Sequence, residues 1–338
     1  MHEPGQSPEG RTHLPRIMIL AGLVALLLLF FGSLFLIFLN NRFTPARGAI
    51  RAARPSEPPA STIVVKGFGL WVQERGVERG NTPVVVLLAE AGQSGSSFDA
   101  SFRFLESDRR VILYDPRGCG NSQSKAELSD YTVANLVAEL DAVRTQIARA
   151  DSIILIGHAF GGALALHYAL THPGEVERLI LISPLPVNGI RYETIGDLLF
   201  DYGDALRKAG IPPGQEDEAN RWQEHYGYLS AVDGLADSRH ASLLGSLGGS
   251  FGPARALLLS LASGQRSAVT GLQTLSTPTL VLYGAAEPRW TREEHQLELE
   301  QLLPHARAVR FEQSGHWLFV EQPERFADEV QRFLSSAK

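Results

Sequence analysis

Hydrophobic positions form one long uninterrupted run near the start of the chain, followed by many short runs. The long run, Ile17–Leu39 (IMILAGLVALLLLFFGSLFLIFL), carries no charge and is apolar on every face. Its length fits the roughly 20 residues that cross a bilayer. A cleaved signal peptide has a shorter apolar core of about 7–15 residues and a small-residue exit, and neither is present. We therefore expect a single-pass transmembrane helix at Ile17–Leu39, after an N-terminal tail of residues 1–16.

Charges on either side of this run bear on its orientation. Two arginines precede it and four follow it, namely Arg11 and Arg16 before and Arg42, Arg47, Arg51 and Arg54 after. The positive-inside tendency then favours a cytoplasmic C-terminal domain. The excess of positive charge after the run is small, because the N-terminal amine adds a charge before it. The sequence thus predicts a membrane location with the lipid bilayer as a partner. The charge difference favours the cytoplasmic side for the C-terminal domain, but this difference is small.

Short apolar runs alternate with helix-like patterns through the rest of the chain. Residues 40–61 are rich in Pro, Ala and Arg and are typical of a linker, and TIVVKGFGLWVQERG then predicts a hairpin turning at Gly67. Further strands are predicted at Val84–Leu88, Val111–Tyr114, Ile153–Ile156, Arg178–Ile182, Thr279–Tyr283 and Ala308–Phe311. Helices are predicted at Ser97–Leu105, Val133–Arg149, Phe160–His172, Arg292–Leu302 and Pro323–Ser336. This alternation predicts an α/β fold around a mostly parallel sheet.

The alternation lapses over residues 185–270, which contain helix-like segments, Gly-rich breaks and several aromatic residues. A segment of this length is far longer than an ordinary loop, so we interpret it as a helical cap inserted into the fold. The core then consists of residues 62–184 and 271–338.

Composition excludes several classes of function. The net charge of −6 and the lack of a Lys/Arg block in the soluble part argue against nucleic-acid binding. The single cysteine, Cys119, excludes an intramolecular disulfide and a multi-cysteine metal site. No cofactor or metal motif is visible, and His167 and His172 are interpreted as packing or surface residues.

The most informative motif is IGHAFGG, which follows the predicted strand at Ile153–Ile156. Its glycines, Gly157, Gly161 and Gly162, have the spacing of a G-x-S-x-G nucleophile elbow, in which a strained strand-to-helix turn exposes a serine oxygen. Here Ala159 stands in the place of that serine. Because removal of a catalytic serine costs on the order of a millionfold in turnover, acyl-enzyme hydrolysis at position 159 is excluded.

Together, four segments resemble the α/β-hydrolase superfamily, with the local features of its prolyl iminopeptidase-like branch. They are VVVLLAEAG, YDPRGCGNS, IGHAFGGALALHYA and the C-terminal pair LVLYGAAEP and SGHWLFVEQPERF. The resemblance runs from about Thr62 to Lys338. It implies an α/β-hydrolase fold with a cap that sets specificity and with nucleophile, acid and base in that chain order.

The resemblance also implies roles for individual residues. His316 matches the general base, and Glu287 stands where the family usually has an aspartate that orients this base. The backbone N–H groups of Phe160 and of the loop at Glu90 match the oxyanion hole. That loop reads AEAG instead of a Gly-rich sequence, so we expect it to have lost its catalytic shape. Asp115 and Arg117 are expected to brace a turn.

Three hypotheses remain open from the sequence. The first is a membrane-anchored pseudoenzyme with a binding, scaffolding or complex-subunit role, which explains why Ala159 and the loop at Glu90 depart together. The second is a serine hydrolase, esterase or aminopeptidase-like, that was disarmed by a serine-to-alanine replacement. The third is nucleophile-independent chemistry, in which a dyad of His316 and Glu287 acts as a general base on a small molecule under the cap.

Overall fold

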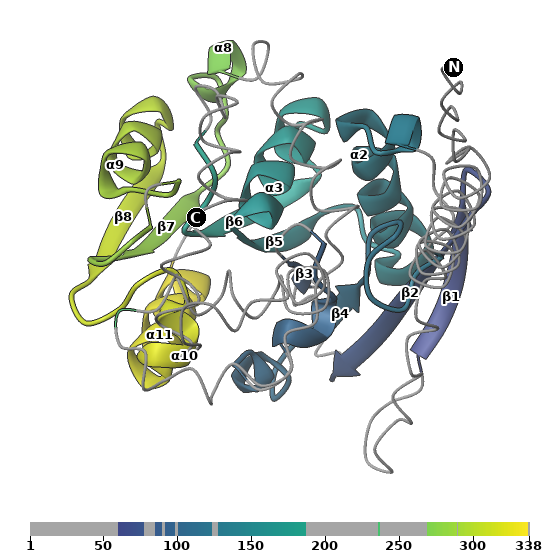
Figure 1. Ribbon diagram of the computed structural model, residues 1–338, viewed down its shortest axis with the longest axis horizontal. Helices are drawn as coiled ribbons and strands as arrows, with labels where there is room; N and C mark the ends of the chain where they lie inside the picture. The colour runs from purple at the N-terminus through teal and green to yellow at the C-terminus, as the bar shows by residue number, and fades with distance from the viewer. Residues whose placement is uncertain are drawn as a thin grey trace, which may run out of the picture. The chain divides into compact units, whose positions relative to one another are not determined.

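Eight strands form one sheet with helices on both of its faces (Figure 1). The structure is a computed structural model that describes residues 60–77, 85–89, 92–98, 101–123, 128–186, 236, 269–288 and 290–336. The strand order is β1-β2-β4-β3-β5-β6-β7-β8. The strands are β1 (Ala60–Val65), β2 (Phe68–Gly76), β3 (Val85–Leu88), β4 (Arg110–Tyr114), β5 (Ile153–His158), β6 (Val176–Ile182), β7 (Thr279–Gly284) and β8 (Ala306–Phe311).

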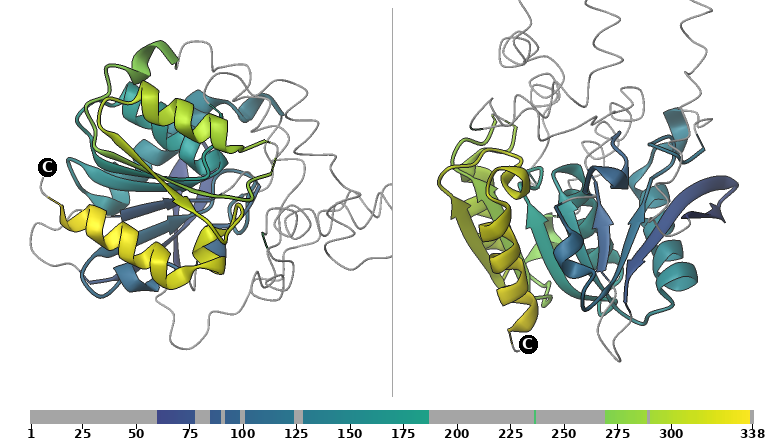
Figure 2. Two further views of the ribbon diagram at one scale, coloured as in Figure 1. Left: turned by 90° about the vertical axis from the view of Figure 1, so that its left-hand side faces the viewer. Right: turned by 90° about the horizontal axis from the view of Figure 1, so that it is seen from below.

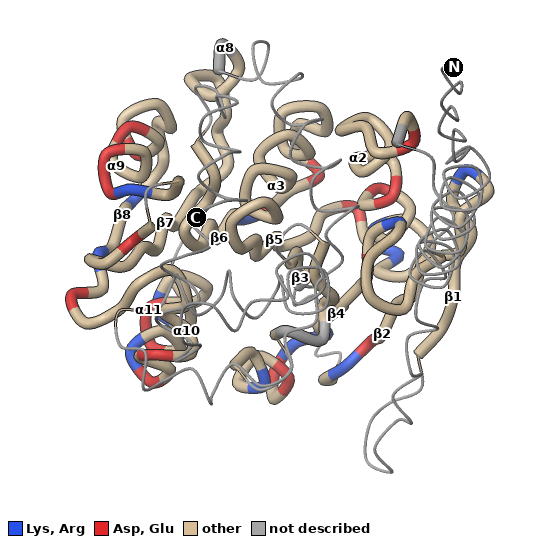
Figure 3. Tube along the Cα trace, in the orientation of Figure 1, with Lys and Arg blue, Asp and Glu red and all other residues tan. Residues whose placement is uncertain are grey.

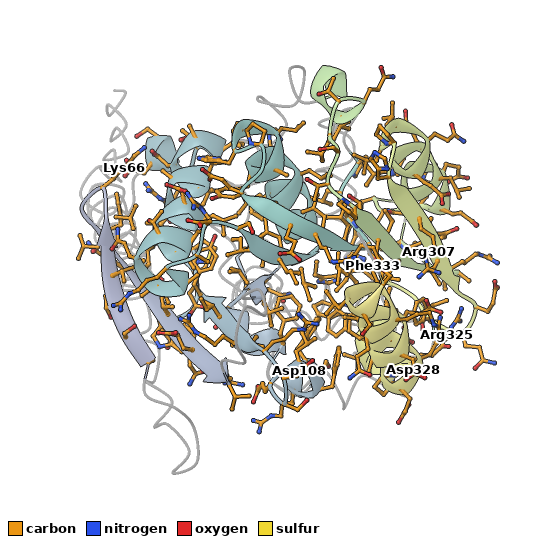
Figure 4. The ribbon with its side chains drawn as sticks, turned by 180° about the vertical axis from the view of Figure 1, so that it is seen from behind. Lys66, Asp108, Arg307, Arg325, Asp328 and Phe333 are labelled. Atoms are coloured by element: carbon orange, nitrogen blue, oxygen red, sulfur yellow. The ribbon has the colours of Figure 1, made fainter. Side chains whose placement is uncertain are left out.

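The predicted hairpin opens the sheet. β1 and β2 pair antiparallel and are joined by Lys66 and Gly67, both of which have positive φ (49° and 86°). Positive φ at both turn residues matches the right-handed twist of the flanking strands. The ammonium group of Lys66, which Figure 4 labels, donates to the Asn135 side-chain oxygen at 3.0 Å and so ties the turn to α2 (Val133–Ala142).

The remaining strands confirm the predicted mostly parallel sheet. β2 pairs antiparallel with β4, and every later neighbouring pair from β4 to β8 is parallel. All residues of β5 and β7 are buried, which explains why their sequences read as continuous apolar runs without alternation. The carboxyl ends of these central strands lie at one edge, where α/β folds place their sites.

Helices cover both faces of the sheet and create a hydrophobic core on each (Figure 2). One face packs against α2 (Val133–Ala142), α3 (Phe160–Thr171) and α9 (Glu293–Leu302), with the short α8 (Val269–Leu272) preceding β7. The other face packs against α10 (Leu318–Glu321) and α11 (Pro323–Ser335). Lys, Arg, Asp and Glu gather on the outer helices, whereas β5 is free of them (Figure 3).

α11 is amphipathic and docks on the sheet through one apolar stripe. Phe326, Val330 and Leu334 are buried at a spacing of four residues, which places them on one helix face. The Arg325 guanidinium lies 4.3 Å from the centre of the Phe311 ring in β8, and Arg307 of β8 pairs with Glu329 of the helix at 3.1 Å (Figure 4). Charge and apolar packing therefore fix this helix beside the last strand.

Two predicted helices differ from the observed ones. Within Ser97–Leu105 the described residues form two 3₁₀ helices, η1 (Gly95–Phe98) and η2 (Arg103–Leu105). The apolar spacing that suggested a helix is real, because Phe98, Phe102 and Leu105 are buried, but the short turns bury them equally well. The helix predicted at Val133–Arg149 continues beyond α2 as a π-helical turn, η4 (Val143–Ala148).

Several predictions fall outside the described residues. They concern the tail 1–16, the span Ile17–Leu39, the linker 40–61 up to residue 59, Glu90 of the oxyanion loop, and the cap 185–270 apart from residues 185, 186, 236, 269 and 270. Among the helices of the described ranges, none is long and apolar enough to cross a membrane.

Candidate active site

The turn between β5 and α3 has the geometry of a nucleophile elbow, with Ala159 at its apex. Ala159 adopts φ 48° and ψ −108°, a conformation that L-residues rarely occupy and that costs about 1–3 kcal/mol. A Cβ atom on Gly161 would lie 2.1 Å from the Leu88 carbonyl oxygen, and one on Gly157 would lie 2.4 Å from Gly161 backbone atoms. The two glycines are therefore required by close approach of α3 to β3 and β5.

Hydrogen bonds hold the apex of the elbow against the next strand. The Ala159 N–H donates to the Ile182 carbonyl of β6 at 2.9 Å, and the Ala159 carbonyl accepts from Leu185 at 3.2 Å. α3 begins at Phe160, directly after Ala159, and a helix leaves the first N–H groups of its N-terminal turn without an intrahelical partner. The helix dipole adds partial positive charge there, which favours a developing oxyanion.

His316 lies in the turn between β8 and α10, where the structure brings it to Glu287. The two side chains are 0 % and 2 % exposed, and His316 Nδ1 lies 3.0 Å from Glu287 Oε2. A carboxylate oxygen accepts, so Nδ1 of His316 carries a proton. Nε2 is buried and has no hydrogen-bond partner among the described residues.

Glu287 follows β7 and is held by three further donors. Its Oε1 accepts from the Ser183 hydroxyl at 2.5 Å and from the Gly284 N–H at 2.9 Å, and its Oε2 accepts from the Thr291 hydroxyl at 2.6 Å. Ser183 lies directly after β6 and also has a positive φ of 43°. These bonds fix the orientation of the carboxylate, and through it the orientation of the imidazole.

His158, the last residue of β5, is a part of the site that the sequence analysis did not single out. Its ring lies 4.3 Å from the His316 ring between centres, and its Nε2 lies 3.1 Å from the His316 carbonyl oxygen. Burial and the neighbouring His316 lower the pKa of His158 well below its usual value. His158 is therefore neutral at physiological pH. Its position beside the elbow motif was the signal that could have found it.

The turn that carries His316 is also bound to its surroundings through Glu321 of α10. One carboxylate oxygen of Glu321 accepts from the Gly315 N–H at 2.7 Å, and the other accepts from the Ala236 N–H at 2.9 Å. Ala236 belongs to the predicted cap. Glu321 thus joins this cap residue to the main chain next to His316.

Asp115 and Arg117 brace the turn after β4, as the sequence analysis expected. The buried Asp115 carboxylate accepts from the N–H groups of Gly95 and Asn121, each at 2.7 Å. Arg117 pairs with Glu139 of α2 at 2.5 Å, and both side chains are almost fully buried. Burial raises the pKa of Asp115 and Glu139 despite these partners.

One group of the described residues could offer ligand atoms to a metal ion. Side-chain atoms of Asp141, His172 and Glu175 lie within 4.8 Å of one another. Arg144 already pairs with both carboxylates at 2.9 Å, and the His172 ring stacks on Tyr168. The positive charge that these carboxylates require is therefore supplied by the guanidinium.

A mostly parallel sheet with a strained elbow after β5 and an acid–histidine pair after β7 and β8 defines an α/β-hydrolase fold. The chain belongs to this family: the family model described as alpha/beta hydrolase fold matches residues 82–323. This confirms the fold that the four sequence segments implied.

Relatives of known name refine the comparison. A proline iminopeptidase from Heyndrickxia coagulans is 26% identical over 294 residues, covering 81% of this chain and 98% of that protein. A 2-hydroxymuconate semialdehyde hydrolase from Pseudomonas putida is 30% identical over 259 residues, covering 73% and 84%. An esterase from Exiguobacterium antarcticum superposes with a TM-score of 0.62 at 22% identity, covering 82% of this chain and all of the esterase, and shows the fold alone.

These relatives overturn the first hypothesis from the sequence, a membrane-anchored pseudoenzyme. The proteins that the chain resembles carry the names of working hydrolases, and none of these names points to an inactive homologue or to membrane anchoring. The hypothesis gave most weight to the missing oxygen of Ala159 and the altered loop at Glu90. It gave too little weight to the pair of His316 and Glu287, which is buried and held by hydrogen bonds.

Proposed function

We propose that this chain is a hydrolase that cleaves a small ester or amide at its carbonyl carbon. His316 is the general base, Glu287 orients it, and water is the nucleophile. The observation that carries the proposal is the buried pair of His316 and Glu287, whose Nε2 lone pair has no partner among the described residues. A neutral imidazole with a fixed tautomer is suited to accept a proton near neutral pH.

The reaction follows from these groups. A water molecule between His316 Nε2 and the substrate attacks the carbonyl carbon while Nε2 takes one of its protons. The negative charge that develops on the carbonyl oxygen is stabilised by the N–H groups at the start of α3, beginning with Phe160. The tetrahedral intermediate then expels the alcohol or amine. This leaving group takes up the proton that His316 Nε2 received from the water molecule.

In this proposal Ala159 occupies the position of a nucleophilic serine. The strained backbone of the elbow and the pair of His316 and Glu287 support that assignment. The expected rate is low, because a hydrolase site without its nucleophile retains on the order of 10³–10⁴-fold catalysis over water.

The apolar residues around the elbow favour a substrate with an apolar acyl or leaving group. Ala159, Phe160, Leu185 and Trp290 are all buried and belong to the hydrophobic core on the face of the sheet that α3 covers. The Trp290 ring also lies 4.3 Å from the His316 ring. We infer that the substrate is a small molecule whose apolar group packs against these residues.

The names of the relatives set the substrates to be tried. They describe a proline iminopeptidase, a 2-hydroxymuconate semialdehyde hydrolase and esterases, all of which hydrolyse their substrates. Short-chain p-nitrophenyl esters and proline arylamides sample the ester and amide classes with a chromogenic product. They also keep the leaving group constant within each class.

A serine enzyme disarmed at position 159 is the second candidate, and the strain at Ala159 favours it. The strained turn of a nucleophile elbow exposes the side-chain oxygen of a serine, whereas a water nucleophile does not need such a turn. In that case Ala159→Ser would form an acyl-enzyme and release p-nitrophenol in a burst, followed by slower steady turnover.

The test compares the full-length chain with Ala159→Ser and with His316→Gln in both backgrounds. We expect slow, burst-free hydrolysis by the parent chain and faster hydrolysis by Ala159→Ser, by a factor on the order of 10² or more. Both rates should fall when His316 is replaced. Hydrolysis only by Ala159→Ser would favour the second candidate, and no hydrolysis by either chain would contradict both.

A further inference from the structure

His158 contacts the proposed base directly but does not take part in the reaction described above. It is 1 % exposed and packs among aromatic rings, with the Trp317 ring centre 4.5 Å away and the Phe319 ring centre 5.2 Å away. Its Nε2 lies 3.1 Å from the main-chain carbonyl oxygen of His316. A hydrophobic side chain would fill this space at lower cost, because a buried polar group must be hydrogen-bonded to be tolerated.

The partner of His158 defines its protonation state. A carbonyl oxygen only accepts hydrogen bonds, so Nε2 of His158 carries a proton. The second ring nitrogen is not protonated as well, because burial and the nearby His316 disfavour a charged ring and lower the pKa of His158. His158 is thus a neutral donor aimed at the main chain of the base.

Other contacts fix the turn of His316 from different sides. The Ala286 N–H donates to the Ser314 carbonyl at 3.0 Å, and Glu321 accepts from Gly315 at 2.7 Å. A Cβ atom on Gly284 would lie 2.2 Å from the Gly315 carbonyl oxygen, so β7 also approaches this turn closely. None of these contacts comes from β5. His158 supplies the contact between the strand that ends at the elbow and the main chain of His316.

We propose that His158 is a positioning residue, whose N–H on the His316 carbonyl sets the place of the His316 imidazole relative to the elbow. This inference rests on the proposed role of His316 as the base. His158 is the neighbour of Ala159 in the chain and contacts the main chain of His316. A shift of the turn that carries His316 therefore changes the distance between the base and the reacting atoms. A misplacement of about 1 Å in such a geometry costs on the order of 10²-fold in rate.

The first test does not depend on activity. Histidine-selective isotope labelling of the full-length chain gives the ring resonances of His316, which a His316→Gln spectrum assigns. We expect His158→Leu to shift these resonances and His158→Gln, which keeps an N–H donor, to restore most of the parent positions. The matched control is His167→Leu on α3, whose pKa burial also lowers. Unchanged His316 resonances in His158→Leu would overturn the proposal.

The second test measures turnover in the Ala159→Ser background. His158→Leu should lower kcat per folded molecule about 10- to 100-fold with KM nearly constant. His158→Gln should recover most of the lost kcat. His167→Leu should change neither kcat nor KM. A purely structural role would lower the folded fraction and leave kcat per folded molecule unchanged, which would overturn the proposal. If His158→Leu does not fold, His158→Asn replaces it, because its amide is too short to reach the carbonyl.

The two tests separate failure of this inference from failure of the proposed function. If Ala159→Ser and its parent hydrolyse nothing, the proposed function fails, and the ring resonances alone decide whether His158 positions His316. If the parent chain and Ala159→Ser are both active but Ala159→Ser is insensitive to His158→Leu, the proposed function stands and the role of His158 is refuted.

Discussion

At the scale of single residues, Ala159 carries backbone strain that its side chain does not explain. Its φ of 48° would suit glycine, yet the position holds an alanine that is fully buried. Strain of this kind persists only where the surroundings impose it. Here the surroundings are the two hydrogen bonds to Ile182 and Leu185, which leave the turn little freedom.

We predict that Ala159→Gly stabilises the protein. Relief of the positive φ contributes about 1–3 kcal/mol, and the greater backbone freedom of glycine in the unfolded chain offsets about 0.5–1 kcal/mol of it. The free energy of unfolding, measured with denaturant, should rise by about 0.5–2 kcal/mol. Ala165→Gly in the middle of α3, also buried, is the matched control and should destabilise. Equal losses of unfolding free energy in both variants would show that the backbone at Ala159 is not strained.

A second prediction concerns the donors that hold Glu287. Ser183→Ala and Thr291→Val each remove one hydroxyl from the carboxylate. In the Ala159→Ser background, kcat should fall about 10- to 100-fold for each, because a hydrogen bond to a charged group contributes about 1.5–3 kcal/mol. Thr274→Val, which removes an exposed hydroxyl bonded to Gly271, should leave kcat unchanged. A loss in the control as large as in the other two would refute a specific effect.

The sequence predicted Glu287 and His316 as acid and base, and the structure places these two side chains in contact, but the residues that orient them were not predicted. Glu287 and His316 follow recognisable strands and lie within segments that resemble a family. Ser183, Thr291 and His158 contribute through the register of β5 and β6 and the path of the turn after β7. No local pattern encodes these three-dimensional relations, so only the structure could show them.

At the scale of elements, the close approach of α3 to the sheet limits what the elbow tolerates. We predict that Gly161→Ala destabilises the protein by about 1–3 kcal/mol or prevents folding, because its Cβ atom would lie 2.1 Å from the Leu88 oxygen. Gly69→Ala in β2 is the control, since its Cβ atom would meet Thr62 at an ordinary 3.4 Å. Thermal unfolding of the two variants compares them, and equal stability would contradict the packing argument.

The strands could be predicted from the sequence because their physical cause is local. β5 and β7 are buried on both faces, and burial of every residue produces an apolar run that is visible in the sequence. The helix prediction for Ser97–Leu105 was wrong, because the same apolar spacing is compatible with an α-helix and with two 3₁₀ turns. There the choice depends on tertiary contacts, such as the bond from Gly95 to Asp115.

At the scale of the whole molecule, histidines that lose solvent contact on folding make stability depend on pH. Burial lowers the pKa of His158, His167 and His295 below the unfolded value of about 6.5. The unfolded chain therefore binds more protons between the folded pKa values and pH 6.5, and stability falls as the pH drops through this window. Asp115 and Glu139, whose pKa values are raised, act in the opposite direction at lower pH.

The share of His158 in this dependence is testable with one substitution. His158→Gln cannot take up a proton, so its free energy of unfolding should fall less than that of the parent as the pH drops from 6.5 to 5. The difference in slope is at most about 1.4 kcal/mol per pH unit. Above pH 7 the difference between the two proteins should be constant. Parallel curves below pH 6.5 would show that His158 titrates normally and is not held neutral.

In the proposed reaction His316 activates water, in a chain that lacks a nucleophilic side chain at position 159. The most direct measurement is the steady-state rate of p-nitrophenyl ester hydrolysis by the full-length parent chain and by His316→Gln at the same pH. We expect burst-free hydrolysis by the parent and a clearly lower rate in the variant, in which only the N–H groups of α3 and substrate binding remain. Equal rates in parent and variant would contradict it.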